Sequence, residues 1–166
     1  MGAREVRILE GGLPKWRAEG RRLEAGPVTR APARFSARFD AAQVADLAQM
    51  RSTTRQIADA RPAGRFSGEV AEPRPGLRSG HMPGAKSAPS TGLVENGTLK
   101  SADALRAQFA AANIDLAAPT VTSCGSGVTA AILKLALERA GATDVILYDG
   151  SWAEWGGRDD TPVDKG

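Results

Sequence analysis

The chain has 166 residues, of which 42% are hydrophobic, 25% charged and 5% aromatic, which excludes a disordered acidic chain, a collagen-like repeat and a disulfide scaffold. The formal net charge is +3, but residues 1–38 hold nine Lys/Arg against four Glu, a net of +5, so the other 128 residues sum to −2. Because the basic segment lacks interleaved aromatic residues, we do not expect nucleic-acid binding.

Targeting and redox signals point to a reducing compartment. No stretch approaches the roughly 18 consecutive apolar residues that a membrane span needs. The first ten residues carry Arg4, Glu5, Arg7 and Glu10 where a signal peptide has an apolar block. The single cysteine, Cys124, excludes an intramolecular disulfide. We therefore expect a cytoplasmic protein without a membrane segment.

The first half of the chain predicts few regular elements. Residues 6–16 indicate a short strand, a glycine turn and the start of a helix, and residues 17–33 a basic linker broken by glycine and proline. Asp40 is expected to cap a helix over residues 41–50. A short strand is expected at residues 56–58, and residues 64–89 should be mostly loop.

The second half alternates strands and helices. Ser101 is expected to cap a helix that ends near residue 112, and residues 119–123 form a β-branched run typical of a strand. A second helix should run from about residue 129 to 140 and end at Gly141, followed by a strand over residues 145–148. This alternation predicts an α/β fold, with a parallel sheet flanked by helices on both faces.

A short internal repeat suggests two domains. Residues 6–16 match residues 145–155 in type at most positions, because both segments pass from an apolar run to an acid, a glycine and, five residues later, a tryptophan. The offset of 139 residues is about one domain length. We expect residues 1–34 to be the C-terminal remnant of a preceding domain plus a linker, and residues 35–166 to be a catalytic domain.

The loop from Cys124 to Thr129 carries the strongest functional signal. It lies between a predicted strand and a predicted helix, where successive N–H groups and the helix N-terminus form a site for an anion. The same field would stabilise a Cys124 thiolate and lower its pKa. The alternative is a buried, inert cysteine, the more common fate of a single Cys.

Three chemistries could use such a loop. A cysteine phosphatase needs an arginine six residues after the nucleophile, where this chain has Ala130. A dinucleotide site is suggested by the G-x-G-x-x-A pattern from Gly125 to Ala130 and by Asp149, but only 17 residues follow Asp149. The third chemistry is sulfur transfer through a cysteine persulfide.

The loop resembles the active-site loop of 3-mercaptopyruvate sulfurtransferases in the rhodanese superfamily, whereas thiosulfate-preferring members usually carry Arg-Lys at positions 125–126. Further segments resemble family motifs in family order: residues 59–61, 64–66, 72–76, 80–84 and 148–155. The resemblance covers about residues 35–160 and implies a rhodanese-like fold. Residues 9–16 resemble the end of the family's first domain, which supports the two-domain interpretation.

The resemblance also implies the roles of site residues. Cys124 would be the nucleophile that takes up sulfur, and Ser126 would join a relay with residues of the first domain. The implied substrate-binding residues are Arg65, Arg74, Gly125, Gly127, Val128 and Thr129. His81 is expected to be a structural turn residue, and Asp59 and Arg61 to form an internal ion pair or to brace a loop. No metal or cofactor is expected.

The implied reaction takes sulfur from 3-mercaptopyruvate, or less favourably from thiosulfate, and releases pyruvate. A thiol such as thioredoxin, or cyanide, would accept the sulfur, and a separate first domain is a further possible partner. The alternative is a catalytically weak domain that acts as a binding or sulfur-relay module.

Overall fold

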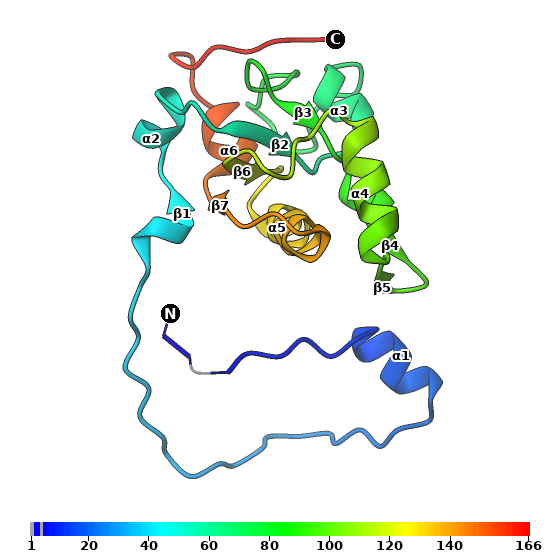
Figure 1. Cartoon of the computed structure of the whole chain (residues 1–166). Helices are drawn as coiled ribbons and strands as arrows, with labels where there is room; N and C mark the ends of the chain where they lie inside the picture. The colour runs from blue at the N-terminus through cyan, green and yellow to red at the C-terminus, as the bar shows by residue number, and fades with distance from the viewer. Residues whose placement is uncertain (1, 4) are drawn as a thin grey trace.

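A five-stranded parallel sheet forms the centre of the molecule in the computed structural model, which describes residues 2–3 and 5–166 (Figure 1). The strands lie in the order β1 (Val44–Ala45), β7 (Val145–Tyr148), β6 (Thr120–Ser123), β2 (Gln56–Asp59) and β3 (Lys86–Ser87). The predicted strands at residues 56–58, 119–123 and 145–148 are confirmed. The predicted α/β fold with a parallel sheet is therefore correct.

Helices cover both faces of the sheet. One face packs against α4 (Ala102–Ala111) and α5 (Val128–Ala140), which contribute Phe109 and Leu133 to a core with Ala58 and Val145. The other face packs against α2 (Leu47–Arg51) and α6 (Ser151–Trp155), in a core that includes Ile57, Val121 and Trp152. Neighbouring residues of a strand point to opposite faces, so Ile57 and Ala58 serve different cores.

The central strand, β6, brings the two halves of the chain together. All four of its residues are buried, as expected for a strand covered on both faces. Its register places Ser123 beside Asp59, the last residue of β2. Cys124 and Arg61 follow these strand ends, so both lie at the carboxyl edge of the sheet, where ligands bind in parallel α/β proteins.

The region from residue 41 to 50 differs from the single helix that the sequence predicts. Ala41–Gln43 is a 3-10 helix (η1), β1 follows, and α2 begins only at Leu47. Asp40 does accept a hydrogen bond from the Ala42 amide, but Asp46 caps α2 with a reciprocal capping box. The apolar pattern fits one helix, and residues 44–45 are extended only because β1 pairs with β7, a tertiary contact.

The predicted long loop at residues 64–89 is also interrupted by regular structure. It contains most of α3 (Ala63–Ser67) and all of β3. Beyond it, η2 (Ser90–Gly92) leads into a hairpin of β4 (Val94–Glu95) and β5 (Thr98–Leu99). Both helices predicted in the second half are confirmed, with Ser101 capping α4 and Gly141 ending α5.

The N-terminal segment runs apart from the sheet and carries α1 (Gly12–Ala18) (Figure 1). The short strand predicted before this helix is wrong, because residues 5–9 have no strand neighbour to pair with. None of the described residues up to Asp40 is buried.

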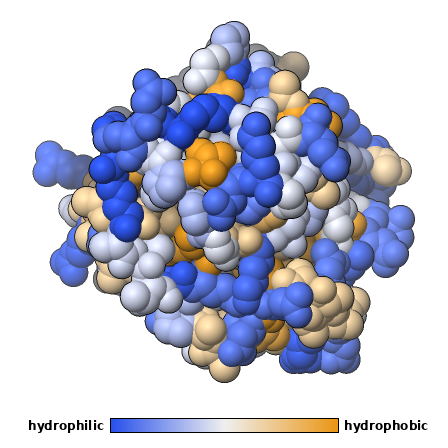
Figure 2. Space-filling model, turned by 90° about the horizontal axis from the view of Figure 1, so that it is seen from above, coloured by the Kyte–Doolittle hydropathy of each residue, from blue (hydrophilic) through white to orange (hydrophobic). Residues whose placement is uncertain are grey.

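The molecular surface seen from above is mainly hydrophilic, with hydrophobic side chains in small separate groups (Figure 2). Among the described residues, no helix has the length and apolar character to cross a membrane.

Candidate active site

The loop that follows β6 holds Cys124, the predicted nucleophile. Cys124 is 1% exposed, and its Sγ accepts a hydrogen bond from the Ser126 amide at 3.4 Å. Gly127 then adopts a φ of +84° and is the N-cap residue of α5, a helix of 13 residues that begins at Val128. The thiol therefore lies at the N-terminal end of α5, where the helix dipole favours a negative charge.

The surroundings of the sulfur favour its thiolate. Burial of the thiol raises the pKa of Cys124, but hydrogen bonds outweigh this effect and leave the pKa below its ordinary value. These hydrogen bonds come from the side chain of Thr129 and from the backbone amides of Ser126, Ala130 and Thr129. The loop therefore supplies the electrostatic field of a reactive cysteine.

A cavity of about 370 Å³ opens above the thiol. One wall is the cysteine loop with the first residues of α5, and the other comes from residues 60–62, α3 and the segment that follows it. The charged residues of that second wall are Arg61, Arg65, Glu72 and Arg74. An anionic substrate would thus meet guanidinium groups on one side and backbone amides on the other.

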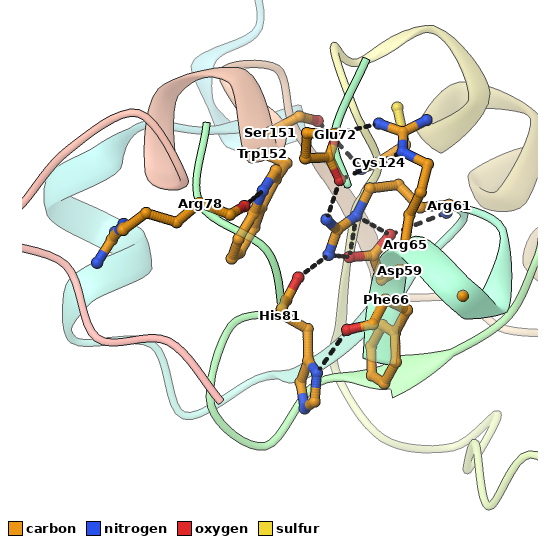
Figure 3. Close-up of polar contacts among 12 residues, drawn as sticks. Asp59, Arg61, Arg65, Phe66, Glu72, Arg78, His81, Cys124, Ser151 and Trp152 are labelled. Carbon is orange, nitrogen blue, oxygen red and sulfur yellow. Dashed lines mark hydrogen bonds and ion pairs between the residues drawn. The ribbon is translucent and has the colours of Figure 1, made fainter. Parts of the chain in front are cut away.

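Arg65 closes over the loop and is held by Glu72 (Figure 3). Its Nε donates to Glu72 Oε1 at 3.2 Å, and its Nη2 forms an ion pair with Glu72 Oε2. A Cβ atom on Gly125 would lie 2.9 Å from Arg65 Nη2, so a glycine at this position lets the guanidinium approach the loop. Arg65 is 23% exposed and can reach a ligand in the cavity.

Arg61 is the buried member of the arginines that line the cavity. Its guanidinium donates to Asp59 Oδ2 at 2.8 Å and to Glu72 Oε1 at 2.8 Å, and it lies 4.2 Å from the ring centroid of Trp152. The side chains of Asp59, Arg61 and Glu72 are each 1% exposed. The predicted internal ion pair of Asp59 and Arg61 is confirmed.

Residues 43–158 match the Rhodanese-like domain family. The chain belongs to this family. It is 46% identical to the 3-mercaptopyruvate sulfurtransferase of Escherichia coli (strain K12), with 98% of this chain and 59% of that protein aligned. It is also 42% identical to the thiosulfate sulfurtransferase of Gallus gallus, over 93% of this chain and 54% of that protein.

The rhodanese-like fold is also seen in a solved relative. The crystal structure of SseA from Escherichia coli, a 3-mercaptopyruvate sulfotransferase, superimposes with a TM-score of 0.78 at 42% identity. The superposition covers 91% of this chain and 58% of that chain. This chain thus spans a little over half the length of these relatives, and their whole-protein activities concern longer molecules.

The rhodanese-like domain brings most of the predicted site residues together. Seven of them line the cavity: Arg65, Arg74, Cys124, Gly125, Ser126, Val128 and Thr129. Gly127 is not among its lining residues, and its amide donates to Ser151 Oγ at 3.0 Å. A Cβ atom on Gly127 would lie 2.8 Å from Asp149 Oδ1, so a glycine at this position leaves room for the Asp149 side chain.

His81 has the structural position that the sequence predicted for it. Its Nδ1 lies 2.9 Å from the carbonyl oxygen of Phe66, and the two rings stack with centroids 3.9 Å apart (Figure 3). Its backbone forms an isolated bridge with Asp164. The histidine is not among the residues that line the cavity.

Two residues with a part in the site received no role from the sequence. Glu72 lies within a recognised motif, yet only its burial between two arginines shows that it is their counter-ion. Ser151 is 27 residues from Cys124 but hydrogen-bonds the Cys124 amide at 3.2 Å. The signal available for Ser151 was its place directly after the turn that ends β7.

Proposed function

We propose that this domain carries out sulfur transfer, with Cys124 taking sulfur from 3-mercaptopyruvate and passing it to a thiol or to cyanide. The observation that carries the proposal is the position of the Cys124 sulfur between hydrogen-bond donors of its loop and a wall of arginines. The curated relatives named above support the same reaction class.

In the first half-reaction, the Cys124 thiolate attacks the thiol sulfur of 3-mercaptopyruvate. A sulfur–sulfur bond forms while the carbon–sulfur bond breaks, and the bonding electrons remain on carbon as the enolate of pyruvate. A proton then adds to this carbon and pyruvate leaves. Ser126, which is exposed at the rim of the cavity, is the proposed relay for this proton. Cys124 retains the sulfur as a persulfide.

The loop donors would stabilise both charged forms of the cysteine. Backbone N–H groups that are already oriented need no rearrangement when charge develops on the outer sulfur. Arg65 and Arg74 would hold the substrate carboxylate, because a planar guanidinium can bind a carboxylate through two parallel hydrogen bonds.

In the second half-reaction, an acceptor thiolate attacks the outer sulfur of the persulfide and the Cys124 thiolate leaves. The acceptor needs only a thiol that can reach the cavity, which a small molecule or a protein such as thioredoxin could provide. A nucleophile that must cycle through a free thiol suits the cytoplasm, where thiols are kept reduced.

The donor preference follows from the charge of the loop. Gly125 and Ser126 place no cation beside the sulfur, so the loop side chains offer no attraction to the doubly charged thiosulfate. The single carboxylate of 3-mercaptopyruvate would instead be bound by Arg65 and Arg74 on the opposite wall of the cavity. Thiosulfate is the second donor to test, because one of the relatives is a thiosulfate sulfurtransferase.

The test is the intact mass of the reduced protein after incubation with 3-mercaptopyruvate, with Cys124→Ser as the control. We expect the wild type alone to gain one sulfur atom and to release pyruvate. A folded wild type that gains no sulfur from either donor would contradict the proposal and favour a binding or relay module.

A further inference from the structure

The start of α6 is tied to the cysteine loop by a set of four hydrogen bonds. Ser151 Oγ accepts from the amides of Cys124 at 3.2 Å and of Gly127 at 3.0 Å. The Trp152 amide donates to the Cys124 carbonyl at 2.9 Å, and the Ala153 amide donates to the Gly125 carbonyl at 2.9 Å. The conformation of the cysteine loop is therefore held by residues 151–153, which lie outside the loop in the sequence.

These contacts determine which polar groups of the loop point toward α6 and which point toward the Cys124 sulfur. Two carbonyl oxygens, which would repel an anionic sulfur, are engaged by α6. Two amides, at the two ends of the tight turn, are drawn to the Ser151 hydroxyl, while the amide of Ser126, between them, donates to the Cys124 sulfur. The turn that aims this donor at the sulfur is thus closed by Ser151.

Ser151 is itself held in one orientation. It is fully buried, and its hydroxyl donates to the Tyr148 carbonyl at 2.9 Å. One donated and two accepted hydrogen bonds use the full capacity of a hydroxyl. Its φ of +50° is uncommon for a residue other than glycine, so the backbone alone would favour glycine here. The side chain accounts for a serine at this position.

We propose that Ser151 is a positioning residue for the Cys124 nucleophile, closing the loop so that its free amides converge on the sulfur. The inference deepens the proposed function, on which it rests for the role of the cysteine. Charged groups that line the cavity are Arg61, Arg65, Glu72 and Arg74, and Asp149 lies behind Gly127. All of these charged groups remain when Ser151 is replaced. A change in the pKa of the Cys124 thiol would therefore report a change in the conformation of the loop.

The test compares Ser151→Ala and Ser151→Gly with Thr161→Val. Thr161 is the matched control because its hydroxyl is also buried, but it donates to the Trp155 carbonyl at 2.6 Å, at the far end of α6. The readout is the rate of Cys124 alkylation by iodoacetamide between pH 5 and 10, which needs no sulfur donor. Circular dichroism checks the fold of each variant.

We expect both Ser151 variants to shift the alkylation midpoint upward by about one pH unit, which slows the reaction about tenfold below the midpoint. Thr161→Val should keep the wild-type midpoint. Folded Ser151 variants with an unchanged midpoint would overturn the inference.

A measurement on the unmodified protein covers the case in which neither variant folds. Amide hydrogen exchange should show strong protection at Cys124 and Gly127, the two donors to Ser151, and rapid exchange at these amides would also overturn the inference. Failure of the proposed function is separately visible: the wild type would then accept no sulfur while the midpoint still shifts in the Ser151 variants.

Discussion

Glu72 shows how a single buried carboxylate holds two of the arginines that line the cavity. Its side chain is 1% exposed and pairs with both Arg61 and Arg65. With Asp59, the group holds two acids and two arginines, so its formal charges balance. Burying a charge is costly unless it is paired and fully hydrogen-bonded, and here each member has its partner. Binding of a substrate carboxylate at Arg65 would compete with Glu72.

Replacing Glu72 by Gln should therefore destabilise the protein by about 3 kcal/mol, because it leaves two guanidinium groups without their shared counter-ion. Urea unfolding measures the change. The control is Glu138→Gln, which breaks the exposed Lys134–Glu138 pair on α5. Such surface pairs contribute at most about 1 kcal/mol. Equal losses in the two variants would contradict the role assigned to Glu72.

The sequence was informative about individual residues where local pattern and family resemblance agreed. Cys124 stands at a strand–loop–helix junction, so the sequence alone indicated that backbone amides and the helix N-terminus would stabilise its thiolate. Glu72 and Ser151 could not be assigned in this way. The role of each depends on a partner supplied by another element, and that partner is fixed only by the register of the sheet and the packing of α6.

At the scale of elements, helices with a local capping signal could be predicted from the sequence, whereas the short strand β1, which depends on pairing with a neighbouring strand, could not. The helices α4 and α5 have local start or stop signals, Ser101 and Gly141, and both were predicted. In the region from residue 40 to 51, Asp40 and Asp46 each cap an element, whereas the sequence predicted only Asp40 as a cap. Only the pairing of β1 with β7 shows that the chain is extended between them.

Asp46→Ala should destabilise the protein by about 1 kcal/mol, because it removes the carboxylate that accepts a hydrogen bond from the Gln49 amide at the start of α2. This helix carries the buried Met50 into the core that contains Trp152. Asp40→Ala is the matched variant and should cost less than about 0.5 kcal/mol, since Asp40 caps an exposed 3-10 turn of three residues. Urea unfolding of the two variants measures both losses of stability. A larger loss in Asp40→Ala than in Asp46→Ala would contradict the assignment of Asp46 as the more important cap.

At the scale of the whole molecule, the N-terminal segment and the sheet domain differ in how they use apolar residues. Val6, Ile8, Leu23 and Phe35 are each more than half exposed. The two cores, in contrast, draw only on residues from Ala45 onward. This contrast agrees with the sequence-based division near residue 34, which is a prediction that a deletion can test.

Deletion of residues 1–34 should leave the free energy of unfolding within about 0.5 kcal/mol of the full chain, because substitutions and deletions away from buried contacts change stability little. The helix α1 contains no buried residue, so its loss removes no core contact. Sulfur uptake by Cys124 should also persist, since every residue that lines its cavity lies beyond residue 59. Urea unfolding and intact mass after incubation with the donor measure both effects on the same two proteins. A loss of more than about 1 kcal/mol would show that the segment packs on the domain, and the boundary would then have to move toward the N-terminus.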